Sequence, residues 1–199
     1  MQGYGLTECS PVVSAESFDT AEFSGSVGQP LAKTQVRILD KSQAEIANGE
    51  VGEIAVKGAQ VMQNYWQKQE QNQQIFTKDG YFLSGDMGYF DELGRIKIVD
   101  RAKDLIIISG FNVYPCEIEQ VLNQHLKVLE SACIGVDDEV SGQAVKAFVV
   151  KKAGADLSEK SLIEYCQKHL AHYKIPHTIE WIAELPKSNI GKILKRELV

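Results

Sequence analysis

The pattern of apolar residues changes character at one place in this chain, the charged segment 100–104. Before it, apolar residues come in short runs separated by turn signals such as Asn48-Gly49, a pattern typical of β-strands. After it, such runs alternate with stretches in which apolar residues recur every three or four positions, as in amphipathic helices. The sequence therefore predicts a β-rich half followed by an α+β half, with the segment 100–104 as a candidate hinge.

The first half is expected to form a small β-rich barrel or sheet. Residues 1–30 are rich in Gly, Ser, Thr and Pro and are interpreted as loops and short strands. The turn signal of residues 91–94 is typical of a hairpin. The predicted elements are a short helix at 67–74 and strands at 36–39, 51–57, 81–83, 86–90 and 95–99.

The second half is expected to alternate strands and helices. The apolar run 105–108 is suited to a strand buried on both faces, and further strands are predicted at 132–136 and 144–150. One helix is predicted to start at Pro115 and a second to be capped by Ser158. Their apolar faces hold Ile118, Val121 and Leu122 in the first helix, and Leu162, Ile163, Cys166 and Leu170 in the second, with Leu157 and Leu162 as a hydrophobic staple.

Composition excludes several classes of function. The net charge of -6 over 199 residues and a pI near 5.3 disfavour nucleic-acid binding, which needs a basic face. No apolar run is long enough to cross a membrane as a helix, which takes roughly 18 or more residues. The four cysteines are scattered without a C-x-x-C pair, which favours neither a zinc site nor a disulfide framework and fits a reducing, cytoplasmic compartment.

The segment 3–8, Gly-Tyr-Gly-Leu-Thr-Glu, is the first candidate site. Flanking glycines allow a backbone to approach a ligand closely, and the Tyr4 ring can stack on a base. The Thr7 hydroxyl can bond a phosphate, and the Glu8 carboxylate can hold magnesium. The same residues also fit a simple turn with a capping threonine, so the segment alone leaves both readings open.

Asp86 and Arg101 are the second and third candidates. Asp86 follows Gly85 at the start of a predicted strand, where a carboxylate can accept hydrogen bonds from both hydroxyls of a ribose. An Asx-turn is the alternative. Arg101 can bond a sugar or a phosphate, or it can form a local ion pair worth on the order of 0–1 kcal/mol.

The segment 186–192 is the fourth candidate. Gly191-Lys192 resembles the end of a phosphate-binding loop, but Ile193 replaces the required Ser or Thr and no glycine lies five residues earlier, so a P-loop is excluded. The basic residues here also fit a solvated helix end. The four histidines and four cysteines do not show metal-ligand spacing, and no Gly-x-Ser-x-Gly elbow is present.

Taken together and in order, these segments resemble the adenylate-forming superfamily of acyl-CoA synthetases, luciferases and peptide-synthetase adenylation domains. Residues 4–8 match the family's Y-G-x-T-E motif, and residues 52–66 match its G-E-[IL] to G-Y-W segment. Residues 79–103 resemble the N-G-W-x-x-T-G-D to D-R-x-K signature of fatty acyl-CoA synthetases, and 109–115 with 186–192 look like bacterial long-chain fatty acid CoA ligases. The departures are Asn64 for Gly, Asp79 for Asn, Tyr81 for Trp and Ser84 for Thr.

The resemblance implies a fold, a division into domains and a two-step reaction. The fold is α+β: residues 1–102 are expected to be a β-rich remnant of a large amino-terminal domain, and residues 103–199 a small mobile α+β domain with the hinge near Lys103. ATP, a fatty acid and CoA are the implied substrates. A carboxylate attacks the α-phosphate of ATP, giving acyl-adenylate and pyrophosphate, and the CoA thiol then displaces AMP.

The resemblance also assigns roles to residues. Tyr4 packs on adenine, Thr7 contacts phosphate, Glu8 holds Mg²⁺, Asp86 binds the ribose and Arg101 supports it. Lys192 is the adenylation lysine. The full set of implied residues is Gly3, Tyr4, Thr7, Asp86, Ile98, Arg101 and Lys192 for the nucleotide, Lys192, Thr7 and Glu8 for catalysis, Glu8 for the metal, and Gly110 and Phe111 for CoA.

The family's phosphate loop and most of its acyl pocket precede the Y-G-x-T-E motif, so this chain is expected to be a carboxy-terminal fragment that is inactive without the amino-terminal half. An aryl or amino acid adenylating enzyme and a non-catalytic truncated binding module remain as alternatives. Peripheral contact with the inner membrane and a homodimer are left open, as is the acyl chain length.

Overall fold

The computed structural model describes residues 2–17 and 24–198 and divides into two compact units, Met1–Lys103 and Asp104–Val199. Each unit has a hydrophobic core of its own. Both contain sheets and few helices, so the predicted α+β class is confirmed. None of the helices in the described residues is long and apolar enough to cross a membrane.

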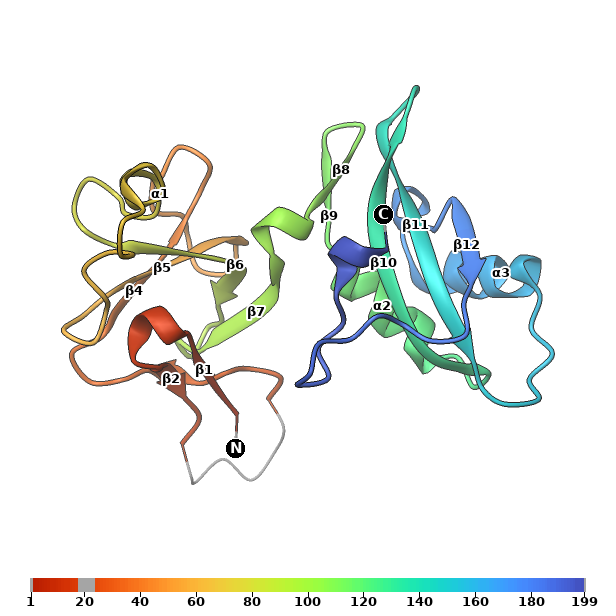
Figure 1. The fold of residues 1–199 in the computed structure, drawn as a ribbon, viewed down its shortest axis with the longest axis horizontal. Helices are drawn as coiled ribbons and strands as arrows, with labels where there is room; N and C mark the ends of the chain where they lie inside the picture. Colours follow the sequence, from red (N-terminus) through yellow and green to blue (C-terminus); the bar gives the residue numbers. More distant parts are fainter. Residues whose placement is uncertain (1, 18–23, 199) are drawn as a thin grey trace. The chain divides into compact units, whose positions relative to one another are not determined.

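Unit 1 consists of two antiparallel sheets (Figure 1). Its only described helices are short. The first sheet has the order β1-β2-β3, and the second is a meander in the order β4-β5-β6-β7. The elements of unit 1 are β1 (Gly3–Gly5), η1 (Thr7–Cys9), β2 (Val12–Ala15), β3 (Gln29–Pro30), β4 (Gln35–Leu39), β5 (Gly52–Lys57), α1 (Gln69–Gln74), β6 (Phe82–Phe90) and β7 (Ile96–Arg101).

Alternation along the strands builds the core of unit 1. Ile38 of β4 and Ile54 of β5 point into the main core, whereas the next residues, Leu39 and Ala55, face a small second cluster on the other side of the sheet. The two sheets are tied together where Ile96 exchanges backbone hydrogen bonds with the segment 27–28, at 2.8 and 2.9 Å. The strands predicted at 36–39 and 51–57 are therefore present as β4 and β5.

One prediction for unit 1 is wrong. The segments 81–83 and 86–90 were expected as two strands, but β6 runs without interruption from Phe82 to Phe90. Its pairing with β5 and β7 shifts register near Gly85 and Gly88. Irregular pairing of this kind bends a strand without ending it, so glycines inside the run were misread as a break.

Unit 2 is built on one three-stranded sheet and a small hairpin (Figure 1). β10 and β11 form a long antiparallel hairpin, and β12 pairs with β11 in parallel. The elements are η2 (Ala102–Asp104) at the boundary, then β8 (Ile106–Ile108), β9 (Phe111–Val113), α2 (Pro115–Gln124), β10 (Val128–Asp138), β11 (Gly142–Lys151), α3 (Glu159–His169), η3 (His172–Lys174), β12 (Thr178–Trp181) and η4 (Lys195–Glu197).

Helices α2 and α3 and the β8–β9 hairpin pack on one face of the sheet. The predicted cap is present, because the Ser158 hydroxyl accepts a hydrogen bond from Ser161 N–H at the start of α3. On the other face, Phe148 and Val150 of β11 pack with Leu185 and Ile193 of the carboxy-terminal segment. That segment is therefore fixed to the sheet by apolar contacts.

Three expectations for unit 2 need correction. The strand at 105–108 is not buried on both faces, because Ile107 is 41% exposed at the centre of β8. β9 and β12 were not predicted, since both are short and β12 has a parallel partner far away in the sequence. The strands predicted at 132–136 and 144–150 are longer than predicted, because β10 and β11 extend beyond these apolar runs into polar residues at both ends.

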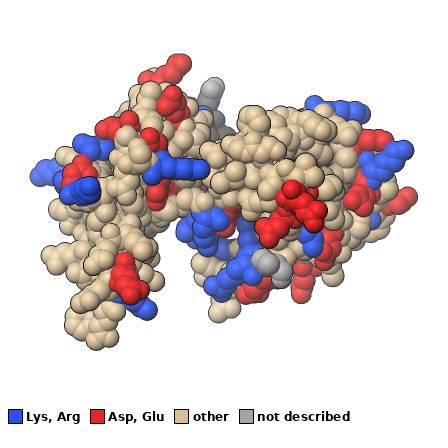
Figure 2. Space-filling view, turned by 90° about the horizontal axis from the view of Figure 1, so that it is seen from above, with Lys and Arg blue, Asp and Glu red and all other residues tan. Residues whose placement is uncertain are grey.

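Charged residues of both signs cover the surface. On the face seen in Figure 2, Lys and Arg side chains are interspersed with Asp and Glu. Ion pairs in the described residues include Lys187 with Glu130 at 2.6 Å and Lys146 with Glu180 at 2.8 Å.

Candidate functional site

Asp86 lies on β6 directly opposite Arg101 on β7. The Asp86 Oδ1 is 2.9 Å from Arg101 Nε, and its Oδ2 accepts a hydrogen bond from the Tyr4 hydroxyl at 2.6 Å. The whole residue is only 5% exposed. The structure thus brings together three of the residues singled out in the sequence, Tyr4, Asp86 and Arg101, from three different strands.

The part of β6 just before Asp86 is held by two hydrogen bonds to side chains. Gly85 has a φ of +72°, a conformation that favours glycine, and its N–H donates to Glu53 Oε1 at 2.9 Å. The Asp86 N–H is 3.1 Å from the Ser84 hydroxyl oxygen. The carboxylate is therefore aimed by the local backbone as well as by its two donors.

This arrangement suits a carboxylate that receives hydroxyl groups. An ionised carboxylate offers about four lone-pair sites, of which Tyr4 and Arg101 use two, so each oxygen can still accept a hydrogen bond. Burial, and then the hydrogen bond to Asp86, raise the pKa of the Tyr4 phenol well above its ordinary value. Tyr4 therefore remains a donor at neutral pH.

The Tyr4 ring itself belongs to the main core of unit 1 and is 8% exposed. Stacking on adenine through an open ring face stays a prediction. Gly3 lies beside it on β1, exposed, and Ile98 lies on β7 with an exposed side chain. Ile98 pairs with Gly88, three residues before Arg101.

Glu8 and Thr7 lie on the single 3-10 turn η1. The Glu8 Oε1 accepts a hydrogen bond from the Tyr65 hydroxyl at 2.6 Å, and its backbone carbonyl accepts one from Met62 N–H at 2.8 Å. Thr7 is exposed and Glu8 is half-buried. Burial, followed by the bond to Glu8, raises the pKa of Tyr65 to about 12, so the phenol is the donor in this pair.

Glu8 fits a magnesium ion of the kind that comes with a nucleotide. Mg²⁺ is usually bound by one or two carboxylates together with substrate phosphates and water. In the described residues no group of three or more His, Cys, Asp or Glu side chains gathers to form a complete metal cage. The partly exposed Glu8 carboxylate next to the exposed Thr7 residue matches the usual Mg²⁺ site, in which one or two carboxylates act together with substrate phosphates.

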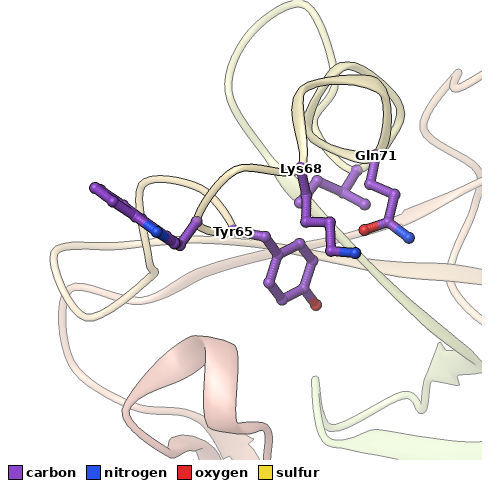
Figure 3. Close-up of a pocket in the computed structure, with 5 residues that line it drawn as sticks. Tyr65, Lys68 and Gln71 are labelled. Atoms are coloured by element: carbon purple, nitrogen blue, oxygen red, sulfur yellow. The ribbon is translucent and has the colours of Figure 1, made fainter.

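A shallow pocket of about 490 Å³ lies next to Tyr65 and was not predicted from the sequence. Figure 3 shows the Lys68 side chain, which comes from the residue before α1, reaching to the side of the Tyr65 ring, with the Gln71 side chain of α1 next to it. The lining residues are Tyr65, Trp66, Lys68, Gln71 and Ile75.

In unit 2, Gly110 and Phe111 lie at the tip of the β8–β9 hairpin. Ser109 and Gly110 both have positive φ, 49° and 84°, which is the pattern of a two-residue type I′ turn. The Phe111 ring stacks on Tyr173 with centroids 4.9 Å apart, and both rings are exposed. Tyr173 was not singled out in the sequence, and aromatic stacking across 62 residues leaves no local signal.

Lys192 lies on a tight turn near the end of unit 2. Ser188 N–H donates to the Lys192 carbonyl at 2.8 Å, and Lys187 pairs with Ile193 as an isolated bridge. The Lys192 side chain is exposed, and among residues 24–198 it has no ion-pair partner. Its neighbour Lys195, in contrast, lies 2.8 Å from Glu119 of α2.

Lys103 lies in η2, immediately before the boundary between the two units. It takes part in none of the ion pairs found in the described part of the chain. Its role as a hinge stays a prediction. The two groups of candidate residues accordingly lie in different units: Tyr4, Glu8, Asp86 and Arg101 in unit 1, and Gly110, Phe111 and Lys192 in unit 2.

Two family models match this chain. The AMP-binding enzyme model matches residues 1–66, and the AMP-binding enzyme C-terminal domain model matches residues 117–192. This chain belongs to the AMP-binding enzyme family. The first match contains Glu8 and Tyr65, and the second ends at Lys192.

Curated relatives and solved structures agree with this membership. A "Long-chain-fatty-acid--CoA ligase" of Yersinia pestis is 50% identical over all of this chain, which spans 35% of that protein. A "2-succinylbenzoate--CoA ligase" of Bacillus licheniformis is 39% identical, with 41% of its length covered. The crystal structure of ATP-bound MatB from Rhodopseudomonas palustris matches 98% of this chain and 39% of its own, with 36% identity and a TM-score of 0.93.

Proposed function

We propose that this chain is part of an AMP-forming ligase that activates a long-chain fatty acid with ATP and transfers the acyl group to CoA. The observation that carries the proposal is the Asp86 carboxylate, which is buried between Tyr4 and Arg101 and makes one contact with each of them, one through each oxygen. In an AMP-binding enzyme such a carboxylate is suited to the ribose of ATP. The complete ligase in the experiments that follow is a protein of the full length of the curated relatives, of which this chain spans 35%.

The proposed chemistry has two steps that share one nucleotide site. In the first, a carboxylate oxygen of the fatty acid forms a bond to the α-phosphorus of ATP, and the bond to pyrophosphate breaks. In the second, the CoA sulfur bonds to the acyl carbon, AMP leaves with the carboxylate oxygen, and the thiol proton passes to solvent. Both steps build negative charge on phosphate oxygens, which positioned cations stabilise.

Residues of both units supply the groups that these steps need. Asp86 orients the ribose, Arg101 holds Asp86, and Thr7 donates to a phosphate oxygen. Lys192 neutralises charge while pyrophosphate leaves; its exposed ammonium without an acidic partner in the described residues supports this role. Mg²⁺, when bound through Glu8, supplies further positive charge at the phosphates. Gly110 and Phe111 line the approach of CoA.

A long-chain fatty acid is proposed as the substrate because the Yersinia pestis relative is 50% identical, against 39% for the 2-succinylbenzoate ligase. An aromatic acid is the second candidate, and that second relative is the observation that favours it.

The substrate test uses the complete ligase with ATP, Mg²⁺, CoA and one acid at a time: palmitate, 2-succinylbenzoate or an amino acid. AMP release is followed. The proposal expects turnover with palmitate far above the other two. Preference for 2-succinylbenzoate would replace the fatty acid by an aromatic acid, and no AMP with any acid would favour a non-catalytic binding module.

The 199-residue chain by itself is proposed to be inactive. Catalysis requires the β- and γ-phosphates to be held in line with the carboxylate, and none of the candidate segments in residues 1–199 has the pattern of the Ser/Thr/Gly-rich phosphate loop. Turnover of the isolated chain near the usual enzyme range, about 1–1000 per second, would contradict this.

We also propose a cytoplasmic protein that touches the inner membrane surface. Leu126 and Leu129 are 86% and 59% exposed in and beside the turn before β10, and Lys127 lies between them. Exposed leucines beside a lysine suit an anionic lipid surface. Cosedimentation with anionic vesicles tests this: a Leu126→Ser and Leu129→Ser double variant should lose the binding of the parent protein, and equal binding would reject it.

A further inference from the structure

Tyr65 holds the carboxylate of Glu8 across 57 residues of sequence. Its hydroxyl donates to Glu8 Oε1 at 2.6 Å, a short hydrogen bond of the charge-assisted type. Met62 N–H donates to the Glu8 carbonyl at 2.8 Å. The loop that contains Met62 and Tyr65 therefore contacts Glu8 at both its backbone and its side chain.

Tyr65 is itself clamped by one side chain of α1. The Tyr65 N–H donates to Asn72 Oδ1 at 2.8 Å, and the Asn72 Nδ2 donates to the Tyr65 carbonyl at 2.8 Å. Asn72 is anchored in turn, because its own N–H bonds to the Lys68 carbonyl at 2.9 Å. An amide side chain that binds both polar groups of one residue fixes that residue's backbone, and with it the direction of the phenol.

We infer that Tyr65 is a positioning residue for Glu8 and that Asn72 holds Tyr65 in place. The inference rests on the proposed function, in which Glu8 contributes to the Mg²⁺ that accompanies ATP. A carboxylate with one oxygen bound to Tyr65 rotates less freely, and its other oxygen, Oε2, is not used by that hydrogen bond. Carboxylates that bind metals are commonly held by such partners, whose removal costs about 10–100-fold in affinity or activity.

A purely structural link between η1 and the loop is the competing explanation. Removal of the hydroxyl would then lower stability and leave the affinity for a divalent ion unchanged. The two explanations therefore differ in a binding measurement that requires no turnover.

The experiment compares the complete ligase with its Tyr65→Phe, Asn72→Ala and Trp66→Phe variants. Mn²⁺ binding is measured by electron paramagnetic resonance in the presence of a non-hydrolysable ATP analogue, with Mg²⁺ as the competitor. Tyr65→Phe keeps the ring and removes only the donor, and Trp66→Phe changes the exposed neighbouring aromatic residue. Transfer from preformed acyl-adenylate to CoA serves as the second readout.

Tyr65→Phe is expected to weaken Mn²⁺ binding about tenfold. Asn72→Ala should weaken Mn²⁺ binding as well. Trp66→Phe should bind Mn²⁺ as tightly as the parent protein does. The transfer step should be unchanged in all three. Parent-like Mn²⁺ affinity in both Tyr65→Phe and Asn72→Ala would overturn the inference, as would an equal loss in Trp66→Phe. Because Tyr65→Phe and Asn72→Ala test the same contact independently, the result does not depend on either variant alone folding correctly.

Glu8→Gln separates this inference from the proposed function. Weak Mn²⁺ binding in Glu8→Gln together with parent-like binding in Tyr65→Phe would overturn only the role of Tyr65. Parent-like Mn²⁺ binding in Glu8→Gln would show that Glu8 does not hold the metal. The positioning role of Tyr65 would then be rejected as well.

Discussion

Asp86 and Arg101 face each other across the β6–β7 pair, with Asp86 Oδ1 2.9 Å from Arg101 Nε. Fifteen residues of sequence separate them, and the hairpin between them is closed by a second pair of the same chemistry, Asp91 with Arg95. Asp86 is almost fully buried and also bonded to Tyr4, whereas the Asp91–Arg95 pair lies at the turn. Substitutions in the Asp86–Arg101 pair and in the Asp91–Arg95 pair can therefore be compared, and only the first is expected to affect the use of ATP.

Asp86→Asn in the complete ligase should lower kcat/KM for ATP about 10–100-fold. Hydrogen bonds to a charged group contribute about 1.5–3 kcal/mol, and the amide loses that charge and one acceptor. Steady-state kinetics with varied ATP measure the effect. Asp91→Asn is the control, and an equal loss of ATP use in both variants would show that the hairpin, not the ribose contact, is affected.

Lys192→Ala should impair adenylation about 10²–10³-fold, the usual cost of removing one group that stabilises transition-state charge. Transfer from preformed acyl-adenylate should change little, because no pyrophosphate leaves in that step. Lys187→Ala, which loses only the ion pair with Glu130, is the matched control. Equal losses in the two half-reactions would reject the assignment of Lys192.

Lys103→Pro should spare adenylation and block thioester formation. Proline fixes φ near -65°, so a boundary residue that must change its backbone conformation between the two steps can no longer do so. Lys103→Ala keeps the backbone free and should carry out both steps. The two half-reactions are measured separately, and full CoA ligase turnover by Lys103→Pro would contradict the hinge role.

Residues 104–199 should fold by themselves, because unit 2 has its own core around Leu162, Ile118 and Val149. Urea unfolding can be followed through Trp181, the one tryptophan of this unit. Leu162→Ala should destabilise it by about 2–5 kcal/mol, whereas Val140→Ala, at a nearly fully exposed position, should stay within about 0.5 kcal/mol. A non-cooperative transition of the parent fragment would contradict an independent core.

Local patterns were enough to predict much of the fold. The change of period near residue 100, the Ser158 cap and the strands β4 and β5 all depend on neighbours in the sequence. β12 was missed because its parallel pairing with β11 is set by residues some thirty positions away. β6 was split in two because a bulge and a strand end have the same glycine signal.

In the candidate site, too, single residues could be predicted from local motifs, whereas contacts between distant residues could not. The motifs of residues 4–8 and 79–86 pointed to Tyr4, Glu8 and Asp86 one at a time. Their contacts could not be derived from the sequence, because Tyr4 with Asp86 and Glu8 with Tyr65 are joined only by the folding of separate strands and loops. Tyr65 lay inside a recognised segment, yet nothing in the segment itself indicates a partner 57 residues earlier.

The most direct test of the account follows one oxygen atom. The complete ligase is supplied with ATP, Mg²⁺, CoA and palmitate labelled with ¹⁸O in its carboxylate, and the products are analysed by mass spectrometry. Attack on the α-phosphorus followed by thiol transfer leaves one labelled oxygen in AMP, and that is the predicted result. Label in inorganic phosphate with release of ADP, or acyl-CoA formed with unlabelled AMP, would contradict an acyl-adenylate route and with it the proposed function of this chain.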